Sequence, residues 1–422
     1  MSLIDKADLN PKVIVLSHPT GNANVRQTVQ ALGEAGLLRE FVTSLKWDRD
    51  SRVNWVLPRS IRSELGRRSF ADIGRARIYT SPCLDAARLL ASRLKLTTLT
   101  KHETGLFSVD AVYRQIDRTV AARLRTARGV KAVYAYEDGA RATFRIARQQ
   151  GIKTVYELPI GYWRAGRLLL EEESCLKPEW SQTLPGNADS DEKLQRKDEE
   201  IELSDHVIVP SNFVLHTLSA AHCLRAPVSV IPYGAPTPWD GNRPGPLHRS
   251  KLRVIFVGAL SQRKGLSYLL EAIERLGAHV SLTLLGAKVG QCRPLEQALR
   301  RHRWIPTASH SKVIEEMRLH DVLVFPSLFE GFGLVLLEAM SQGLPVITTP
   351  NTAGPDIVND GEDGFIVPIR SAEAITAKLE LLMHNPELLW TMSQAAMAKA
   401  VHLSWHAYRA QVVAKLRHIV GA

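Results

Sequence analysis

The stretch from Phe325 to Met340 constrains the fold of this chain more than any other. It reads FPSLFEGFGLVLLEAM, which predicts the end of a strand, a turn with two glycines and the start of a helix. Glycine adopts backbone dihedrals that other residues avoid and lets a ligand approach the backbone closely. A helix that begins just after such a turn presents unpaired N–H groups and a partial positive charge, which suit a phosphate.

Two glutamates, Glu330 and Glu338, frame this turn. If the helix starts near Gly333, Glu338 lies inside it and Glu330 lies in the loop before it. The two carboxylates would then hold different parts of a polyhydroxylated ligand, with backbone donors between them. The alternative is that Gly331 and Gly333 only mark a tight turn and that Glu338 is a solvated helix residue.

The pattern E-G-F-G-x-x-x-x-E resembles the E-x7-E signature of the retaining glycosyltransferases of family 4, which have the GT-B fold. In that family the second glutamate holds the ribose hydroxyls of a nucleotide-sugar. The first glutamate and the backbone N–H groups after it hold the donor sugar and its phosphates. The resemblance therefore implies a catalytic position for Glu330 and donor binding by Glu338. It also implies donor contacts from Gly331, Phe332, Gly333 and Leu334.

Composition narrows the class of protein further. A length of 422 residues predicts two or three domains, and no apolar run approaches the ~20 residues of a membrane helix. The four cysteines are widely spaced, and the N-terminus carries acids and no hydrophobic leader, so we expect reduced thiols in the cytoplasm. The net charge of +11 suits an acidic partner, but no zinc-finger spacing, RNP motif or basic heptad points to nucleic acid.

The N-terminal half reads as a run of β–α units. Residues 12–17 (KVIVLS) form a continuous apolar run that suits a buried parallel strand, and a small-residue loop with Gly21 and Asn22 follows it. In open α/β sheets ligands bind at the carboxyl ends of the strands. We therefore expect Gly21 and Asn22 to offer N–H groups to a phosphate or an acceptor. The glycine-rich loop of family 4 does this, although the usual Gly-Gly pair is absent here.

Further strands are expected over 41–45, 130–136 and 154–158. Glu137 and Asp138 follow the strand over 130–136. They are candidates for binding an acceptor hydroxyl, or alternatively for capping the next helix.

Three side chains after the strand over 154–158, Tyr162, Trp163 and Arg164, suit sugar stacking and phosphate pairing. The alternative is that they are aromatic residues packed at an interface. Residues 171–200 are polar with acidic patches, and we expect a mobile helix–loop–helix segment beside a cleft. Ser211 is expected to cap the helix that follows it.

A basic segment runs from residue 52 to residue 95, where ten Lys or Arg face three acids and apolar residues are interleaved. One interpretation is a solvated helical face. The other is an amphipathic surface that binds anionic lipid, or a lipid-linked phosphate acceptor, at the inner face of the cell membrane.

The C-terminal half follows a segment rich in Pro and Gly over 236–246, which is typical of a linker. Residues 252–257 read as a strand, and its carboxyl-end loop carries Arg263 and Lys264. Two adjacent cations at this edge would neutralise a diphosphate leaving group, the largest charge problem in transferring a sugar from a nucleotide. The alternative is a solvated basic turn.

This loop is similar to the G-R-x-x-x-x-K-G pattern of family 4 at Gly258, Lys264 and Gly265. It departs from the pattern at Ala259, where the family often has an arginine, and Arg263 is taken to substitute. The resemblance thus implies catalytic roles for Lys264 and Arg263 and a donor contact at Gly258.

We therefore expect an α/β protein of the GT-B fold, with two doubly wound Rossmann-like domains facing across a cleft. The expected parts are an acceptor-side domain over 1–235, a nucleotide-sugar-binding domain over 236–402 and, over 403–422, a helix that crosses back to the first domain. No Asp-x-Asp stands in a metal-ready strand-end context and no enzymic nucleophile is evident. The family implies a metal-independent reaction that needs no cofactor besides the nucleotide-diphosphate-sugar co-substrate.

The predicted function is transfer of a sugar, with retention, to a hydroxyl of a glycan or lipid-linked acceptor in exopolysaccharide, lipopolysaccharide or glycolipid synthesis. Two alternatives remain open. One is a nucleotide-sugar epimerase of the same fold. The other is an inactive sugar-binding partner in a polysaccharide assembly complex, against which the intact Glu330, Lys264 and Glu338 argue.

Overall fold

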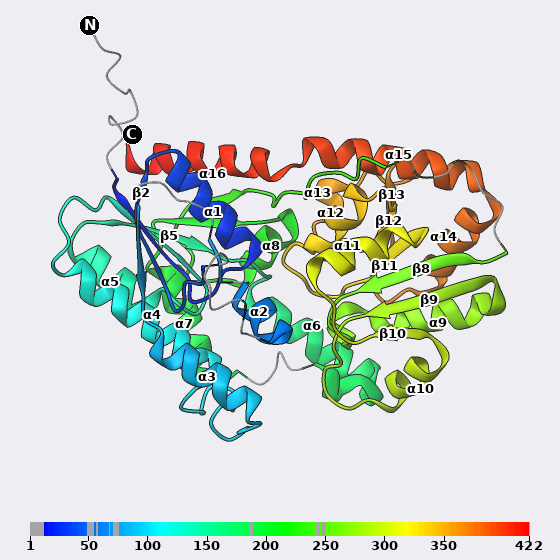
Figure 1. Ribbon diagram of the computed structural model, residues 1–422, viewed down its shortest axis with the longest axis horizontal. Coiled ribbons are helices and arrows are strands. Elements are labelled where there is room, and N and C mark those ends of the chain that lie inside the picture. Colours follow the sequence, from blue (N-terminus) through cyan, green and yellow to red (C-terminus); the bar gives the residue numbers. More distant parts are fainter. Residues whose placement is uncertain are drawn as a thin grey trace, which may run out of the picture.

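The computed structural model describes residues 12–48, 55, 58–66, 68–70, 76–184, 189–241, 243, 245 and 250–421. It contains two parallel sheets, one in each half of the chain, which lie side by side with helices packed around them (Figure 1). The predicted basic segment over 52–95 and the predicted linker over 236–246 fall partly outside the described residues.

The first sheet belongs to the N-terminal half. Its strands are β1 (Ile14–Ser17), β2 (Leu38–Thr43), β3 (Arg77–Thr80), β4 (Ala132–Tyr136), β5 (Lys153–Glu157), β6 (His206–Val209) and β7 (Val228–Val230). The α-helices of this half are α1 (Ala23–Glu34), α2 (Arg59–Gly66), α3 (Cys83–Arg93), α4 (Val109–Leu124), α5 (Arg141–Gln149), α6 (Trp163–Leu176), α7 (Asp191–Glu202) and α8 (Asn212–Thr217). Two 3₁₀ turns join them, η3 (Pro178–Thr183) and η5 (Leu218–Ala220).

The second sheet belongs to the C-terminal half. Its strands are β8 (Leu252–Val257), β9 (Val280–Leu285), β10 (Arg303–Ile305), β11 (Val322–Phe325), β12 (Val346–Thr348) and β13 (Gly364–Ile366). The α-helices here are α9 (Leu266–Leu276), α10 (Arg293–Arg301), α11 (His310–Arg318), α12 (Leu334–Ser341), α13 (Gly354–Ile357), α14 (Ala372–His384), α15 (Pro386–His402) and α16 (Trp405–Val420). The 3₁₀ turns are η6 (Gln262–Lys264) and η7 (Gly277–His279).

Both sheets are doubly wound. The strand order is β3-β2-β1-β4-β5-β6-β7 in the first and β10-β9-β8-β11-β12-β13 in the second. The order reverses between β1 and β4 and again between β8 and β11. In such sheets ligands bind in the crevice beyond the carboxyl ends of the strands at that reversal. The loops after β1, β8 and β11 carry most of the candidate residues, and the segments after β4 and β5 carry the others.

Three of the strands at the reversals, β1, β4 and β11, are completely buried, which explains why the sequence shows them as apolar runs. Every residue of β1, β4 and β11 is buried, as expected for parallel strands covered on both faces. The second strand differs from its prediction over 41–45, because it begins at Leu38, which pairs with Ile14.

The chain passes between the two halves twice, and the two passages lie together. The backbone N–H of Ala235 donates to the carbonyl of Leu403 at 2.6 Å. A Cβ at Gly234 would lie 2.3 Å from the backbone nitrogen of Trp405, so this close approach requires glycine. Beyond it, α16 runs back over the first half and contacts α1 (Figure 1).

The segment of α6 and η3 joins the two halves at a third place, beside the C-terminal half (Figure 1). Glu173 of α6 is completely buried and accepts hydrogen bonds from Gln262 Nε2 at 2.7 Å and Tyr268 Oη at 2.9 Å. Arg370 Nε donates to the same carboxylate at 2.7 Å. The first part of the predicted mobile segment over 171–200 is therefore anchored by a buried polar contact.

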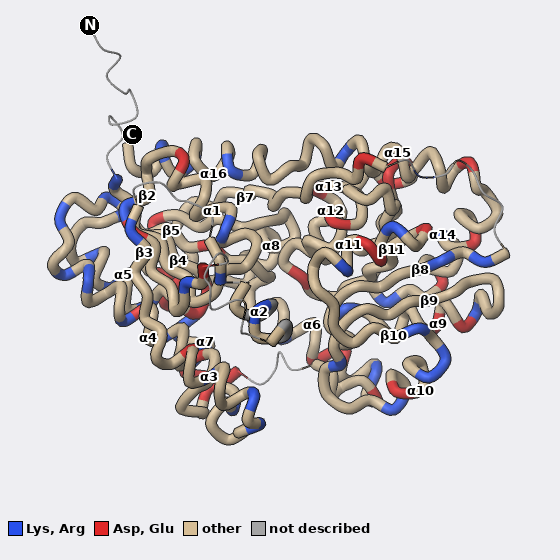
Figure 2. Tube along the Cα trace, in the orientation of Figure 1, with Lys and Arg blue, Asp and Glu red and all other residues tan. Residues whose placement is uncertain are grey.

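Figure 2 shows basic and acidic residues interspersed along both halves in this view. Among the residues that the structure describes, none of the helices combines the length and the apolar run that crossing a bilayer requires.

Candidate functional site

The loops after β8 and β11 interlock at the carboxyl edge of the second sheet. The carbonyl of Arg263 accepts hydrogen bonds from the backbone N–H of Leu328 at 2.9 Å and from Ser327 Oγ at 3.2 Å. Gly265 has φ +69°, and a Cβ there would lie 1.9 Å from the carbonyl oxygen of Pro326. Only glycine fits this position. Local backbone packing therefore explains the glycine of the Lys264–Gly265 pair, which resembles the family pattern.

A compact cluster of charges forms where these loops meet. Lys264 Nζ pairs with the Glu330 carboxylate, and Arg263 Nη1 donates to the carbonyl of Phe329 at 2.7 Å. Arg263 Nη1 also lies 3.5 Å from Glu330 Oε2. The structure thus brings together the three residues that the sequence predicts to be catalytic.

Burial controls the charges of this cluster. It lowers the pKa of Lys264 to about 8, although Glu330 opposes that shift, so the ammonium stays charged at neutral pH. Burial also acts to raise the pKa of Glu330, but Lys264 and Arg263 outweigh it and hold that pKa below its ordinary value. The pair is therefore ionic, and a bound phosphate would find two cations close to its oxygens.

Helix α12 begins next to this cluster, as the sequence predicts. Gly333 precedes it with φ +81°, and Glu338 lies in its second turn. Burial raises the pKa of Glu338, and His310, whose Nδ1 lies 3.6 Å from Glu338 Oε1, partly offsets this. Phe332 is buried, with its ring centroid 5.2 Å from that of Tyr233, so its side chain packs between the halves.

Gly258 lies at the end of β8, with its N–H bonded to the carbonyl of Leu285 at 2.9 Å. A Cβ on Gly286 would lie 1.8 Å from the carbonyl oxygen of Gly258. The backbone of Gly258 is therefore fixed at the base of the loop that carries the two cations.

A cavity of about 650 Å³ opens between the two halves. Gly21 and Asn22 line it from the N-terminal side, and Leu334 and Glu338 line it from the C-terminal side. Residues predicted separately for acceptor and donor contacts therefore share one cavity, next to the start of α12.

The loop that carries Glu330 also touches the first half directly. The N–H of Gly161 donates to the carbonyl of Glu330 at 3.2 Å, and Ser211 Oγ donates to the carbonyl of Gly331 at 2.6 Å. A Cβ at Gly331 would lie 1.7 Å from the carbonyl oxygen of Pro159. The glycine after the first glutamate is therefore required by a backbone contact between the halves.

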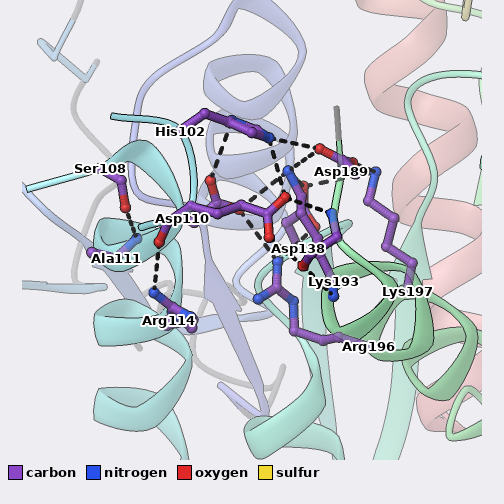
Figure 3. Close-up of polar contacts among 12 residues, drawn as sticks. His102, Ser108, Asp110, Ala111, Arg114, Asp138, Asp189, Lys193, Arg196 and Lys197 are labelled. Atoms are coloured by element: carbon purple, nitrogen blue, oxygen red, sulfur yellow. Dashed lines mark hydrogen bonds and ion pairs between the residues drawn. The ribbon is translucent and has the colours of Figure 1, made fainter. Parts of the chain in front are cut away.

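Glu137 and Asp138 turn toward α7. Lys197 Nζ lies 3.3 Å from Glu137 Oε1, and Arg196 Nη2 lies 3.0 Å from Asp138 Oδ1. Figure 3 shows Asp138 among the cations of α7. Both carboxylates already have cationic partners, and neither is among the described residues that line the cavity at Gly21 and Asn22.

The helix after β4 is capped by another acid than the sequence suggested. Glu200 Oε1 accepts the N–H groups of Ala140 at 3.0 Å and Arg141 at 3.2 Å. Asp117 of α4 accepts the next two N–H groups, those of Ala142 and Thr143, each at 2.8 Å. The alternative prediction, that Glu137 or Asp138 caps this helix, is wrong, because carboxylates of two other helices cap its N-terminus.

Among the described residues, the side chains of His102, Glu103 and Asp189 offer metal-ligand atoms within 4.8 Å of one another. Figure 3 labels His102 and Asp189 of this group. Lys193 Nζ lies 3.0 Å from Asp189 Oδ1, and His102 Nε2 lies 2.8 Å from the same oxygen. A lysine and an imidazole thus already contact this carboxylate, and the group is part of the polar network of α7. The metal independence implied by the family stays a prediction.

Tyr162, Trp163 and Arg164 converge on Asp198. Trp163 Nε1 donates to Asp198 Oδ1 at 2.7 Å, and Tyr162 and Arg164 also contact this carboxylate. The Arg164 guanidinium lies over the ring of Trp163, 4.2 Å from its centroid. This packed arrangement agrees with the alternative prediction for these residues, and Arg164 is not among the described residues that line the cavity.

The sequence analysis missed three arginines that line the cavity: Arg26, Arg68 and Arg88. For Arg26 the sequence contained a signal that could have marked it as a candidate. A cation near the N-terminus of a helix opposes the helix dipole, and Arg26 stands near the start of α1. Arg68 and Arg88 lay within the basic segment, where the sequence could not tell a solvated face from a cavity wall.

Residues 242–399 match the family model described as glycosyl transferases group 1. This part of the chain is similar to that family, as the sequence predicts. The chain is 30% identical over 195 residues to an MMP α-(1→4)-mannosyltransferase of Mycolicibacterium hassiacum, which is 44% of this chain and 47% of the relative. It is 32% identical over 168 residues to a phosphatidyl-myo-inositol mannosyltransferase of Mycobacterium leprae, which is 38% of this chain and 45% of the relative. The chain spans less than half the length of these relatives.

Solved structures resemble nearly the whole chain. A sucrose-phosphate synthase of Thermosynechococcus elongatus has a TM-score of 0.64 at 18% identity, covering 97% of this chain and 99% of that protein. HepE of Anabaena, solved in complex with UDP, has a TM-score of 0.60 at 15% identity, covering 96% of this chain and all of that one (100%). With the two doubly wound sheets, these likenesses confirm the predicted GT-B fold.

Proposed function

We propose that this protein is a glycosyltransferase that moves a sugar, with retention, from a nucleotide-diphosphate-sugar to a hydroxyl of a glycan or lipid-linked acceptor. The observation that carries the proposal is the shared cavity. The loop at Gly21 and Asn22 faces Leu334 and Glu338 across it. Glu330, with its partners Lys264 and Arg263, lies in the turn that leads to Leu334, although none of the three is among the described residues that line the cavity. The relatives' names, which include mannosyltransferases, support a role in polysaccharide or glycolipid synthesis.

In this proposal the cations act on the leaving group. Charge develops on the diphosphate as the bond to the sugar breaks, and Lys264, Arg263 and the N–H groups at the start of α12 are placed to stabilise it. Glu330 holds the sugar and Glu338 holds the ribose hydroxyls. The departing phosphate then helps to deprotonate the acceptor hydroxyl on the same face of the sugar, which retains the anomeric configuration.

Thermal unfolding in the presence of UDP-, GDP-, ADP- and dTDP-sugars tests the donor assignment. We expect at least one of them to raise the melting temperature, because a ligand that binds only the folded state stabilises it by about 2.7 kcal/mol at a hundred times its Kd. Formation of an inverted free sugar without an acceptor would instead favour an epimerase. If none of the four donors shifts the transition at millimolar concentration, the donor assignment is wrong.

We further propose that the basic segment over 52–95 docks on an anionic membrane surface. In its described part, Leu90 of α3 and Leu94, which directly follows that helix, are each 60% accessible, and Arg93 and Lys95 are exposed beside them. Apolar side chains next to cations are what an interfacial membrane contact uses.

Flotation with vesicles tests this surface. We expect the protein to rise with anionic vesicles at moderate ionic strength and to stay behind with neutral ones. The variant Leu90→Ser with Leu94→Ser should rise less, while its net charge is unchanged. An absence of flotation with anionic vesicles would rule the docking surface out.

A further inference from the structure

Another cavity, of about 730 Å³, lies on the N-terminal half against one face of α4. Helix α3, which packs beside α4, and the loop of residues 103–106 form its other walls (Figure 1). None of the described residues that line it also lines the cavity at Gly21 and Asn22. The proposed transfer reaction therefore leaves this cavity without a role.

Helix α4 carries two stripes of different character. One is apolar and buried in the core: Val112, Ile116, Val120 and Leu124. The other lines the cavity and is more polar: Ala111, Arg114, Gln115, Arg118, Thr119 and Ala122. Residues three and four positions apart share one face of a helix. The polar stripe is therefore a continuous surface along the cavity.

The two arginines of this stripe lie one helical turn apart, and neither has an ion-pair partner among the residues that the structure describes. Arg114 Nη2 lies 3.5 Å from the backbone carbonyl oxygen of Glu103. The carboxylate of Glu103 instead accepts the N–H of Ser190 at 2.9 Å. An anion in the cavity would meet two guanidinium groups, which bind carboxylate and phosphate oxygens through paired hydrogen bonds.

Gln115 lies between the two arginines in sequence and has an unsatisfied acceptor. Its Oε1 is buried and receives no hydrogen bond from any of the described residues. Buried polar atoms are nearly always hydrogen-bonded, so this oxygen calls for a partner beyond those residues. That partner must donate a hydrogen, as a hydroxyl does, whereas a carboxylate or phosphate oxygen accepts one.

The walls opposite the arginines' helix add apolar surface on a fixed backbone. Leu84 of α3 and Leu106 of the loop both line the cavity, and Leu106 is 64% exposed. The N–H of Gly105 donates to the carbonyl of Lys101 at 2.9 Å. A Cβ at Gly105 would lie 2.5 Å from the carbonyl oxygen of Leu99, so the loop folds back tightly on itself. The cavity is therefore formed before a ligand enters it.

We propose that this cavity binds an acidic sugar unit of a glycan, with Arg114 and Arg118 holding its carboxylate or phosphate group and Gln115 accepting from one of its hydroxyls. A sugar ring carries hydroxyl donors next to its anionic group, and its C–H face suits the apolar surface of Leu84 and Leu106. One ligand thus accounts for the cations, the acceptor and the apolar walls, the mixture that small-molecule sites use. The site is separate from the transfer cavity and does not depend on the proposed glycosyl transfer.

Ligand-observed NMR titration of the full chain measures this binding without any transfer reaction. The probes are glucuronate and glucose 6-phosphate, and glucose is the neutral match for both. The variants are Arg114→Gln, Arg118→Gln and Gln115→Leu, which keep good helix formers in α4. Arg125→Gln is the matched control, because Arg125 is an exposed arginine that directly follows α4 and is not among the described residues that line the cavity.

We expect at least one acidic probe to bind the wild type and the control more tightly than glucose does. Its affinity should fall by about tenfold in each arginine variant, because a hydrogen bond to a charged group is lost, and by about fivefold in Gln115→Leu, because a neutral one is lost. Glucose should respond only to Gln115→Leu. The affinity for whichever nucleoside diphosphate the donor panel identifies should be the same in all variants.

Four results would overturn the proposal. One is that neither acidic probe binds the wild type, and another is that the cavity variants bind the probes as the control does. A third is that Arg88→Gln weakens binding while Arg114→Gln does not, which would place the anion in the transfer cavity. The fourth is that neither acidic sugar binds, but vesicles of phosphatidylcholine with phosphatidylglycerol bind in a way that depends on Arg114 and Arg118. That result would assign the cavity to a lipid headgroup instead.

Discussion

Turnover should fall by more than about a hundredfold in Lys264→Ala, and by a similar factor in Glu330→Ala, because each removes a contact that strengthens as charge develops in the transition state. Lys264 is 7% exposed and pairs with Glu330, and its Nζ lies 4.8 Å from the ring centroid of Phe325. The measurement is the initial rate of transfer with the donor that the thermal panel identifies, at saturating donor and acceptor.

A control must separate catalysis from folding, because either variant leaves a buried charge without its partner. The double variant Lys264→Ala with Glu330→Ala removes both charges, so it should recover stability and remain inactive. Lys288→Ala is the matched surface control. Lys288 lies in the next strand-end loop and pairs with Glu296 at 2.5 Å, and an exposed pair of this kind contributes little. A near-normal rate in Lys264→Ala or Glu330→Ala would contradict the site assignment.

The parts of this molecule that the sequence predicts well depend on local information. Buried parallel strands appear as apolar runs, so β8 and β11 were located from their own residues. The Lys264–Gly265 pair and the glycine-flanked turn before α12 are local too, because their backbone geometry needs glycine. The family resemblance implied a catalytic role for each of Lys264 and Glu330, but their ion pair was not predicted, since the two come from different loops.

The parts that the sequence does not predict depend on contacts between distant segments. Arg26, Arg68 and Arg88 come from three segments, and only the folded chain brings them around Asp85 and the loop after β1. The same physical reason explains the strand-end acids. Asp138 appeared suited to a ligand until the packing of α7 placed Arg196 against it.

Glu173 is a third residue whose role only the fold reveals. In the sequence it is one of three consecutive glutamates, Glu171, Glu172 and Glu173, in a segment that reads as mobile. The middle one is 60% exposed in its side chain, whereas the side chain of Glu173 is completely inaccessible. Helical geometry turns neighbouring side chains in different directions, and composition alone does not show which one faces inward.

Replacing Glu173 by alanine should destabilise the contact between α6 and the C-terminal half by about 1–3 kcal/mol, because it leaves the buried donors of Gln262 and Tyr268 without their acceptor. Arg370 Nε donates to this carboxylate at 2.7 Å, and Gln262, which precedes the two donor-loop cations, donates to it at 2.7 Å. Native-state hydrogen exchange in α6 and η3 measures the local opening free energy directly. The affinity for the donor should fall as well, because the loop that carries Arg263 and Lys264 loses the hydrogen bond between Gln262 and Glu173.

Glu172→Ala is the matched comparison for this prediction. Glu172 pairs with the same arginine, at 2.9 Å from Arg370 Nη1, but it is exposed, so its loss should cost about 1 kcal/mol or less. Two adjacent glutamates that share Arg370 thus differ in burial and in the hydrogen bonds that Glu173 accepts from Gln262 and Tyr268. If the two variants changed the hydrogen exchange of α6 by the same small amount, the buried carboxylate would not be what holds α6 against the C-terminal half. The loop that carries Arg263 and Lys264 would then be positioned by its own hydrogen bonds with the loop after β11.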